Sequence, residues 1–254
     1  MAWDPAQYLK FSGERLQPAL DLIARIPLVA PASIVDLGCG AGNVAQVLAA
    51  RWPDTELTGV DSSADMLAKA RVALPIAHWV EADIGRYRPT TPPDLIFSNA
   101  ALHWLDDHAA LFPRLLGLAK PGGVVAVQMP RNHGAPSHRA MAEAAREGPW
   151  AKLLAPVLRE SPVAEPAFYH DLLRPLAKAL DIWETEYLHV LEGDNPVVAW
   201  TKGTALKPLL DALSEPLRGA FEADYAKRIR AAYPPRGDGR TLFPFRRLFI
   251  LARM

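Results

Sequence analysis

The sequence predicts an α/β protein built on a doubly wound sheet with helical insertions. Three observations support this: short apolar strand segments alternate with helical segments between residues 33 and 129, glycines join the first strand to the first helix, and prolines gather outside these two elements. This alternation is typical of a parallel sheet covered on both faces, and right-handed crossovers make the doubly wound, Rossmann-like arrangement the default.

The core elements are predicted one after another from apolar runs and their stop signals. Pro53 ends the first helix, Ser62 or Ser63 is placed to cap the second, and Pro113 is expected to interrupt the third near its start. A Lys-Pro-Gly-Gly turn at 120–123 leads into the fifth strand. The predicted strands are 33–37, 56–61, 76–81, 94–98 and 124–128, and the predicted helices are 44–52, 64–73 and 107–118.

The rest of the chain has a different pattern. Prolines break the segment from 130 to 180 into short helices, and 196–232 is expected to be helical. Two later segments, 182–191 and 241–252, are predicted as strands that complete the sheet.

Composition excludes several classes of protein. The 254 residues include 28 Lys and Arg against 28 Asp and Glu, so the net charge is zero and an electrostatically driven nucleic-acid binder is not expected. A single cysteine excludes a disulfide framework, and no Cys or His pairs have zinc spacing. The N-terminus does not resemble a signal peptide, and no apolar run approaches the roughly 20 residues of a membrane span. We therefore expect a cytoplasmic protein without metal, nucleic-acid or membrane partners.

The turn after the first strand is a candidate ligand loop. Asp36 is followed by Gly38, Gly40 and Gly42, and glycines let the backbone turn sharply and approach a ligand closely. The helix that follows offers free N–H groups to an anion. A nicotinamide site would need Gly-x-Gly-x-x-Gly, and a Walker loop would need Gly-Lys-Ser/Thr, so a dehydrogenase is disfavoured and a Walker nucleotide site is excluded.

Acidic residues end the next two strands. Asp61 is 21 residues after Gly40, where a carboxylate can accept hydrogen bonds from ribose hydroxyls, although an Asp in this position can also cap a helix. Asp83 could accept from an exocyclic amine with Ile84 against an aromatic face, or be a surface loop acid.

These segments, in this order over about 100 residues, resemble the motif series of class I S-adenosylmethionine methyltransferases. The resemblance implies that the loop contacts the methionine part of S-adenosylmethionine, that Asp61 holds the ribose, that Asp83 holds the adenine amine, and that Met66 packs on the adenine. The cofactor residues expected on this basis are Asp36, Gly38, Cys39, Gly40, Asn43, Asp61, Ser62, Met66, Asp83, Ile84, Asn99, Ala100 and Trp104.

Segments outside the core narrow the resemblance. Residues 8–15, 98–105, 128–130, 181–183, 200–204 and 247–253 are similar to the trans-aconitate 2-methyltransferase family. This implies methyl transfer to one carboxylate of trans-aconitate, giving a monomethyl ester and S-adenosylhomocysteine. Three alternatives stay open: a methyltransferase acting on O, N or C of another small metabolite, a non-catalytic sensor of the cofactor, and a dehydrogenase.

A carboxylate acceptor simplifies the chemistry. It is ionised at pH 7 and needs no general base, so we expect no catalytic residue, and His103 and His133 are weak candidates that only an alcohol or phenol would require. A polycarboxylate needs cations, which Arg supplies best through its planar fork. One of Arg246 and Arg247 must point inward if the last strand alternates. Lys202 is a further candidate cation. The expected substrate residues are Tyr8, Arg15, Gln128, Arg131, Tyr169, Trp200, Tyr233 and Arg247.

The expected organisation is a single domain. It comprises an N-terminal helical cover (1–30), a cofactor-binding core (31–130), a helical lid or substrate region (131–180 and 195–235) and final strands (181–191 and 241–253). A small anionic carboxylic acid is the expected partner, and the sequence is compatible with a monomer.

Overall fold

The computed structural model describes the backbone of residues 12–254 and the side chains from residue 16 onward. Its sheet has seven strands in the order β3-β2-β1-β4-β5-β7-β6, which confirms the doubly wound prediction and the completion of the sheet by the last two strands. The strands are β1 (Ser33–Leu37), β2 (Glu56–Asp61), β3 (His78–Glu81), β4 (Leu95–Asn99), β5 (Val124–Pro130), β6 (Ala179–Leu191) and β7 (Thr241–Arg253).

The chain divides into two compact units. Of the described residues, the sheet unit contains 15–130, 162–185 and 247–254, and the helical unit contains 12–14, 131–161 and 186–246. Each of the two long strands, β6 and β7, contributes residues to both units.

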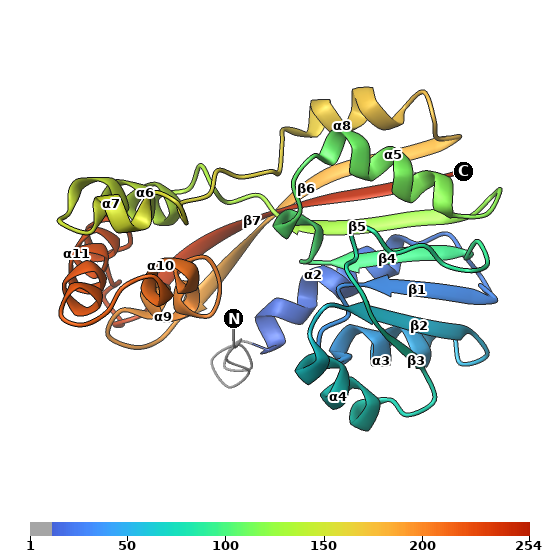
Figure 1. Cartoon of the computed structure of the whole chain (residues 1–254), viewed down its shortest axis with the longest axis horizontal. Helices are drawn as coiled ribbons and strands as arrows, with labels where there is room; N and C mark the ends of the chain where they lie inside the picture. The colour runs from blue at the N-terminus through green and yellow to red at the C-terminus, as the bar shows by residue number, and fades with distance from the viewer. Residues whose placement is uncertain (1–11) are drawn as a thin grey trace. The chain divides into compact units, whose positions relative to one another are not determined.

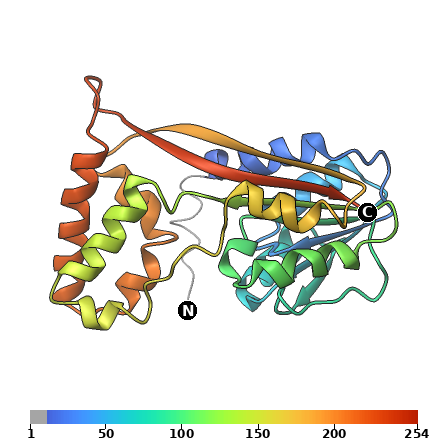
Figure 2. The same ribbon diagram turned by 90° about the horizontal axis from the view of Figure 1, so that it is seen from above.

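Helices cover both faces of the sheet unit. On one face lie α2 and α3, and on the other lie α5 and α8 (Figures 1 and 2). Helix α4 packs beside α3 and against β2 and β3. The helices are α2 (Ser12–Arg25), α3 (Asn43–Arg51), α4 (Ala64–Ala73), α5 (His108–Leu118) and α8 (Pro166–Leu173).

The predicted interruption of the third core helix is wrong, because α5 runs through Pro113 from His108 to Leu118. Buried apolar residues on both sides of the proline, Phe112 and Leu115 among them, hold the two halves in one core. The loss of one backbone hydrogen bond is therefore tolerated.

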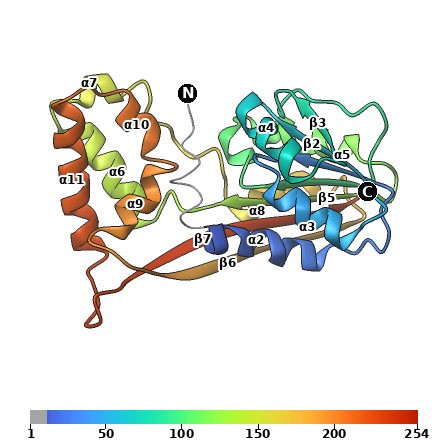
Figure 3. The ribbon, with the colours of Figure 1, turned by 90° about the horizontal axis from the view of Figure 1, so that it is seen from below.

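The helical unit has its own apolar core, built around Trp150, Phe221, Tyr225 and Phe243. Prolines open several short helices at the first position, where the missing N–H costs nothing, as at Pro136 and Pro196. The helices of this unit are α6 (Pro136–Glu147), α7 (Ala151–Leu154), α9 (Pro196–Lys202), α10 (Lys207–Asp211) and α11 (Leu217–Ala232), and α6 packs along α11 (Figure 3). Within residues 12–254, no helix is long and apolar enough to cross a membrane.

Candidate functional site

The glycine loop joins β1 to α3 in a backbone conformation that only glycine adopts readily. Gly38, Gly40 and Gly42 have φ angles of 78°, 54° and 82°. A Cβ on Gly38 would lie 2.2 Å from the Cβ of Ala101, so the turn after β4 presses directly against the loop. The prediction of a sharp turn at these glycines is confirmed.

Asp61 fastens this loop to the end of β2. One carboxylate oxygen accepts the Gly40 N–H at 2.9 Å and the other accepts the Ser63 N–H at 2.9 Å. Each oxygen keeps a lone pair for another donor. The Ser63 hydroxyl caps α4 by accepting from Met66 N at 3.4 Å, which decides the cap in favour of Ser63 over Ser62.

The loop after β3 is held from two sides. Exposed Asp83 accepts the Gly85 N–H at 2.8 Å. From α5, Arg114 donates to the carbonyl oxygens of Ile84 at 3.2 Å and Tyr87 at 3.0 Å. Ile84 thereby comes within 3.7 Å of the Cβ position of Gly38.

The chain turns sharply after β4. Ala100 has a left-handed φ of 53°, and its N–H donates to the Gln128 carbonyl at 2.9 Å. The short helix η1 (Leu102–Trp104) follows, with Trp104 46% exposed and its ring 4.8 Å from that of His103.

Buried polar atoms without a hydrogen-bond partner gather at the carboxyl ends of the central strands. In the described part of the chain they include Asp36 Oδ2, Asn99 Oδ1 and both amide atoms of Gln128. Asn99 pairs with Gln128 and Asp36 pairs with Phe97, so strand alternation places all three side chains on one face of the sheet. Because buried polar groups in proteins are normally hydrogen-bonded, this row indicates a ligand site.

Two charged groups belong to the same face. Burial, with a smaller contribution from Asp61, raises the pKa of Asp36 to about 7. Arg247 is 5% exposed and lies two residues before Phe249, which pairs with Gln128. Its neighbour Arg246 is half exposed and forms an ion pair with Glu186 at 3.7 Å, so Arg247 is the one that points inward.

Tyr169, which was expected to line the substrate pocket, is buried between two helices of the sheet unit. It has no exposed surface, and its hydroxyl oxygen is 2.6 Å from His108 Nδ1 and accepts the Ala164 N–H at 3.2 Å. Its ring packs against Phe112 in the core between α5 and α8. These contacts give Tyr169 a structural role.

Three other expected substrate residues belong to the helical unit. Trp200 is 2% exposed and packs against His189, and the Tyr233 hydroxyl accepts the Ser137 N–H at 3.1 Å. Arg131 donates its N–H to the Arg246 carbonyl at 3.0 Å. Tyr8 and the side chain of Arg15 lie outside the described residues.

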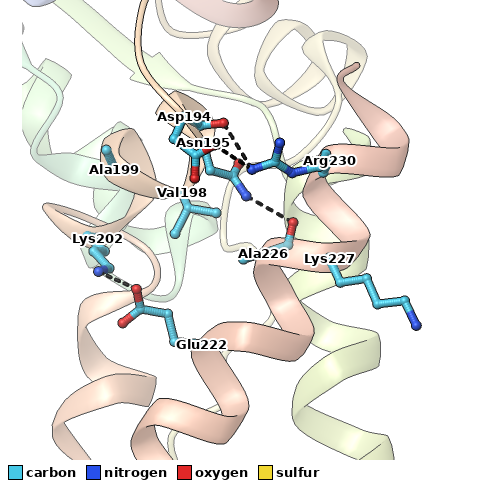
Figure 4. Close-up of a pocket in the computed structure, with 9 residues that line it drawn as sticks. All are labelled: Asp194, Asn195, Val198, Ala199, Lys202, Glu222, Ala226, Lys227 and Arg230. Atoms are coloured by element: carbon cyan, nitrogen blue, oxygen red, sulfur yellow. Dashed lines mark hydrogen bonds and ion pairs between the residues drawn. The ribbon is translucent and has the colours of Figure 1, made fainter. Parts of the chain in front are cut away.

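Lys202 lines a surface cavity of about 450 Å³ in the helical unit (Figure 4). It is paired with Glu222 there, and Arg230 is paired with Asp194 at 2.8 Å, while Lys227 extends away from the other side chains. Lys202 and Arg230 are therefore already paired with acidic side chains at this cavity.

Comparison with known proteins decides the family. A family model described as "Methyltransferase domain" matches residues 8–171. A trans-aconitate 2-methyltransferase from Azoarcus sp. (strain BH72) is 51% identical over 98% of both chains, and one from Rhodopseudomonas palustris (strain BisB18) is 48% identical over the same share. The chain belongs to the trans-aconitate 2-methyltransferase family. In fold it is similar to a methyltransferase from Thiobacillus denitrificans crystallised with S-adenosylhomocysteine, with a TM-score of 0.55 at 17% identity over the whole of both chains.

In this member of the trans-aconitate 2-methyltransferase family, sequence reasoning missed several residues that shape the site. Trp79 packs where a Cβ on Gly59 would lie, and Arg114 and His108 hold two loops from α5. Only the apolar or helical context of these residues was visible in the sequence, since their partners are distant along the chain. Among the described residues, no group of His, Cys, Asp or Glu could hold a metal ion.

Proposed function

We propose that this protein transfers the methyl group of S-adenosylmethionine to a carboxylate of trans-aconitate, giving the monomethyl ester and S-adenosylhomocysteine. The row of unpartnered buried polar atoms beside the glycine loop supports a site for both ligands, and the names of the full-length relatives support the choice of acid.

The residues present fit the methyl donor. S-Adenosylmethionine supplies an electrophilic methyl group on a positively charged sulfur. The loop amides, Asp61 and the Asp83–Ile84 segment would hold its nucleoside, and buried Asp36 would face its positive charge. The raised pKa of Asp36 falls when a cation approaches, so donor binding favours the ionised carboxylate there.

The acceptor end needs binding groups and no base. A carboxylate oxygen forms the new bond to the methyl carbon as the carbon–sulfur bond breaks, and no proton is transferred. Arg247 would pair with a carboxylate, and the Gln128 amide would donate to one of its oxygens. Catalysis then consists of alignment and exclusion of water from the nucleophile.

Product analysis tests this proposal. Purified protein with labelled S-adenosylmethionine is expected to produce a base-labile methyl ester from trans-aconitate, and not from a panel of phenols and amines. The absence of product from trans-aconitate, together with label on a phenol or amine, would overturn the substrate assignment.

A further inference from the structure

A buried hydrogen-bonded chain connects α8 to the turn beside the glycine loop. Tyr169 on α8 contacts His108 Nδ1 at 2.6 Å, and His108 Nε2 lies 3.1 Å from the carbonyl oxygen of Leu102. His108 is 4% exposed and Tyr169 is fully buried. All four segments involved, including Ala164, belong to the sheet unit.

The hydrogen-bond chemistry fixes one proton arrangement. The Leu102 carbonyl can only accept, so Nε2 of His108 carries the proton and Nδ1 accepts from the Tyr169 hydroxyl. The Tyr169 oxygen in turn accepts the Ala164 N–H at 3.2 Å. Burial lowers the pKa of His108, which is consistent with a neutral ring.

The held carbonyl belongs to the turn that borders the site. Leu102 O also accepts the Leu105 N–H at 3.0 Å, and Ala101 O accepts the Trp104 N–H at 3.0 Å. Ala101 is the residue that presses on Gly38. A shift of this turn would move Trp104, and it would also move Ala101, which supports the glycine loop.

We propose that His108, held as the Nε2–H tautomer between the Leu102 carbonyl and the Tyr169 hydroxyl, is a positioning residue for methyl transfer that sets the Ala101–Leu105 turn against the glycine loop. This inference rests on the proposed function only in taking that loop as the methyl-donor site. His108 acts through its contact with the Leu102 carbonyl.

Two substitutions separate the two ring nitrogens. In His108→Gln the amide nitrogen reaches the place of Nε2 and can still donate to Leu102, whereas in His108→Asn the amide reaches only the place of Nδ1. We expect kcat per folded molecule to fall about tenfold in His108→Asn and to stay within about threefold of wild type in His108→Gln, since small misplacements near a reacting centre are costly. Arg174→Met is the matched control, because it removes a side-chain bond to the Ala177 carbonyl in the same unit without touching the turn.

Two measurements do not depend on the substrate. Hydrogen exchange at the Trp104 and Leu105 amides should accelerate in His108→Asn, and neither in His108→Gln nor in Arg174→Met. Nitrogen-15 NMR of labelled histidine should show the Nε2–H tautomer in wild type, because the Leu102 carbonyl can only accept, and this keeps the proposal testable if His108→Asn does not fold.

The proposal is overturned if wild-type His108 is the Nδ1–H tautomer, or if the Gln and Asn variants change exchange and kcat equally. Failure of wild type to methylate trans-aconitate, with the exchange and NMR results as expected, would count against the proposed substrate and leave the positioning role supported.

Discussion

Replacing Gly38 by alanine should damage the site through two separable effects. A φ of 78° costs an L-residue about 1–2 kcal/mol. The new Cβ would lie 2.2 Å from Ala101 Cβ, far inside ordinary contact, and overpacking of this kind costs about 1–3 kcal/mol. The free energy of unfolding should therefore fall by about 2–5 kcal/mol, and S-adenosylhomocysteine should bind more weakly.

Two matched glycines isolate the backbone effect. Gly40 and Gly122 also have positive φ angles, but no described residue other than their chain neighbours comes within 4 Å of their Cβ positions, so alanine there should cost only about 1–2 kcal/mol. Urea unfolding of the three variants gives the steric part by difference.

A double-mutant cycle tests the contact itself. Ala101→Gly removes the atom that the new Cβ would meet. Its effect on the free energy of unfolding should therefore be more favourable in the Gly38→Ala variant than in wild type, by about 1–3 kcal/mol. The reasoning is refuted if Gly38→Ala costs no more than Gly122→Ala, or if the cycle shows no coupling.

Three further predictions concern charged groups. The pKa of Asp36 rises from 3.8 in the unfolded chain to about 7 in the folded protein, so the ligand-free protein should lose stability as pH rises through that interval. Urea unfolding at a series of pH values should show this loss in wild type and a smaller one in Asp36→Asn. An equal dependence of stability on pH in the two proteins would contradict the prediction. Asp61→Ala removes a charged hydrogen bond to Gly40 and should weaken S-adenosylhomocysteine binding by about 1.5–3 kcal/mol, as measured by calorimetry. If the variant binds with wild-type affinity, Asp61 does not hold the glycine loop for the cofactor. Arg247→Ala should raise the KM for the acid by the equivalent of about 2–5 kcal/mol, with half-exposed Arg246→Ala as the control; equal effects would remove Arg247 from the acid site.

Local signals were sufficient to predict the sheet and the loop. Apolar runs and their stop signals predicted most strand ends to within two residues of the observed ends. For example, β3 begins at His78 rather than at residue 76. The spacing of Gly38, Gly40 and Gly42 predicted a backbone that only glycine adopts readily, and all three angles confirm it. Alternation in the last strand correctly implied that one arginine is buried, although it did not decide between Arg246 and Arg247.

Contacts between distant segments could not be predicted in this way. Tyr169 was expected to line the substrate pocket as a hydrogen-bond donor and wall, and nothing local shows that its partner is His108, 61 residues away. The bond from Gly40 to Asp61 depends on the pairing of β1 with β2, and the local signals that located each strand do not say which strands are neighbours. The two compact units likewise follow from packing that only the structure supplies.

The buried charges on one face of the sheet agree with the proposed reaction. Asp36 on β1 and Arg247 on β7 lie on that face, with β4 and β5 between them and with Asn99 and Gln128 on these strands. A sulfonium donor and a carboxylate acceptor carry opposite charges, and transfer converts them into a neutral thioether and an ester. Charge is neutralised along the reaction, so excluding water disfavours the separated ions more than the transition state. The methylated carboxyl group becomes a neutral ester, while the other two carboxylates of trans-aconitate keep their charges. A chain with no net charge can perform this chemistry because only the local charges of the site are used.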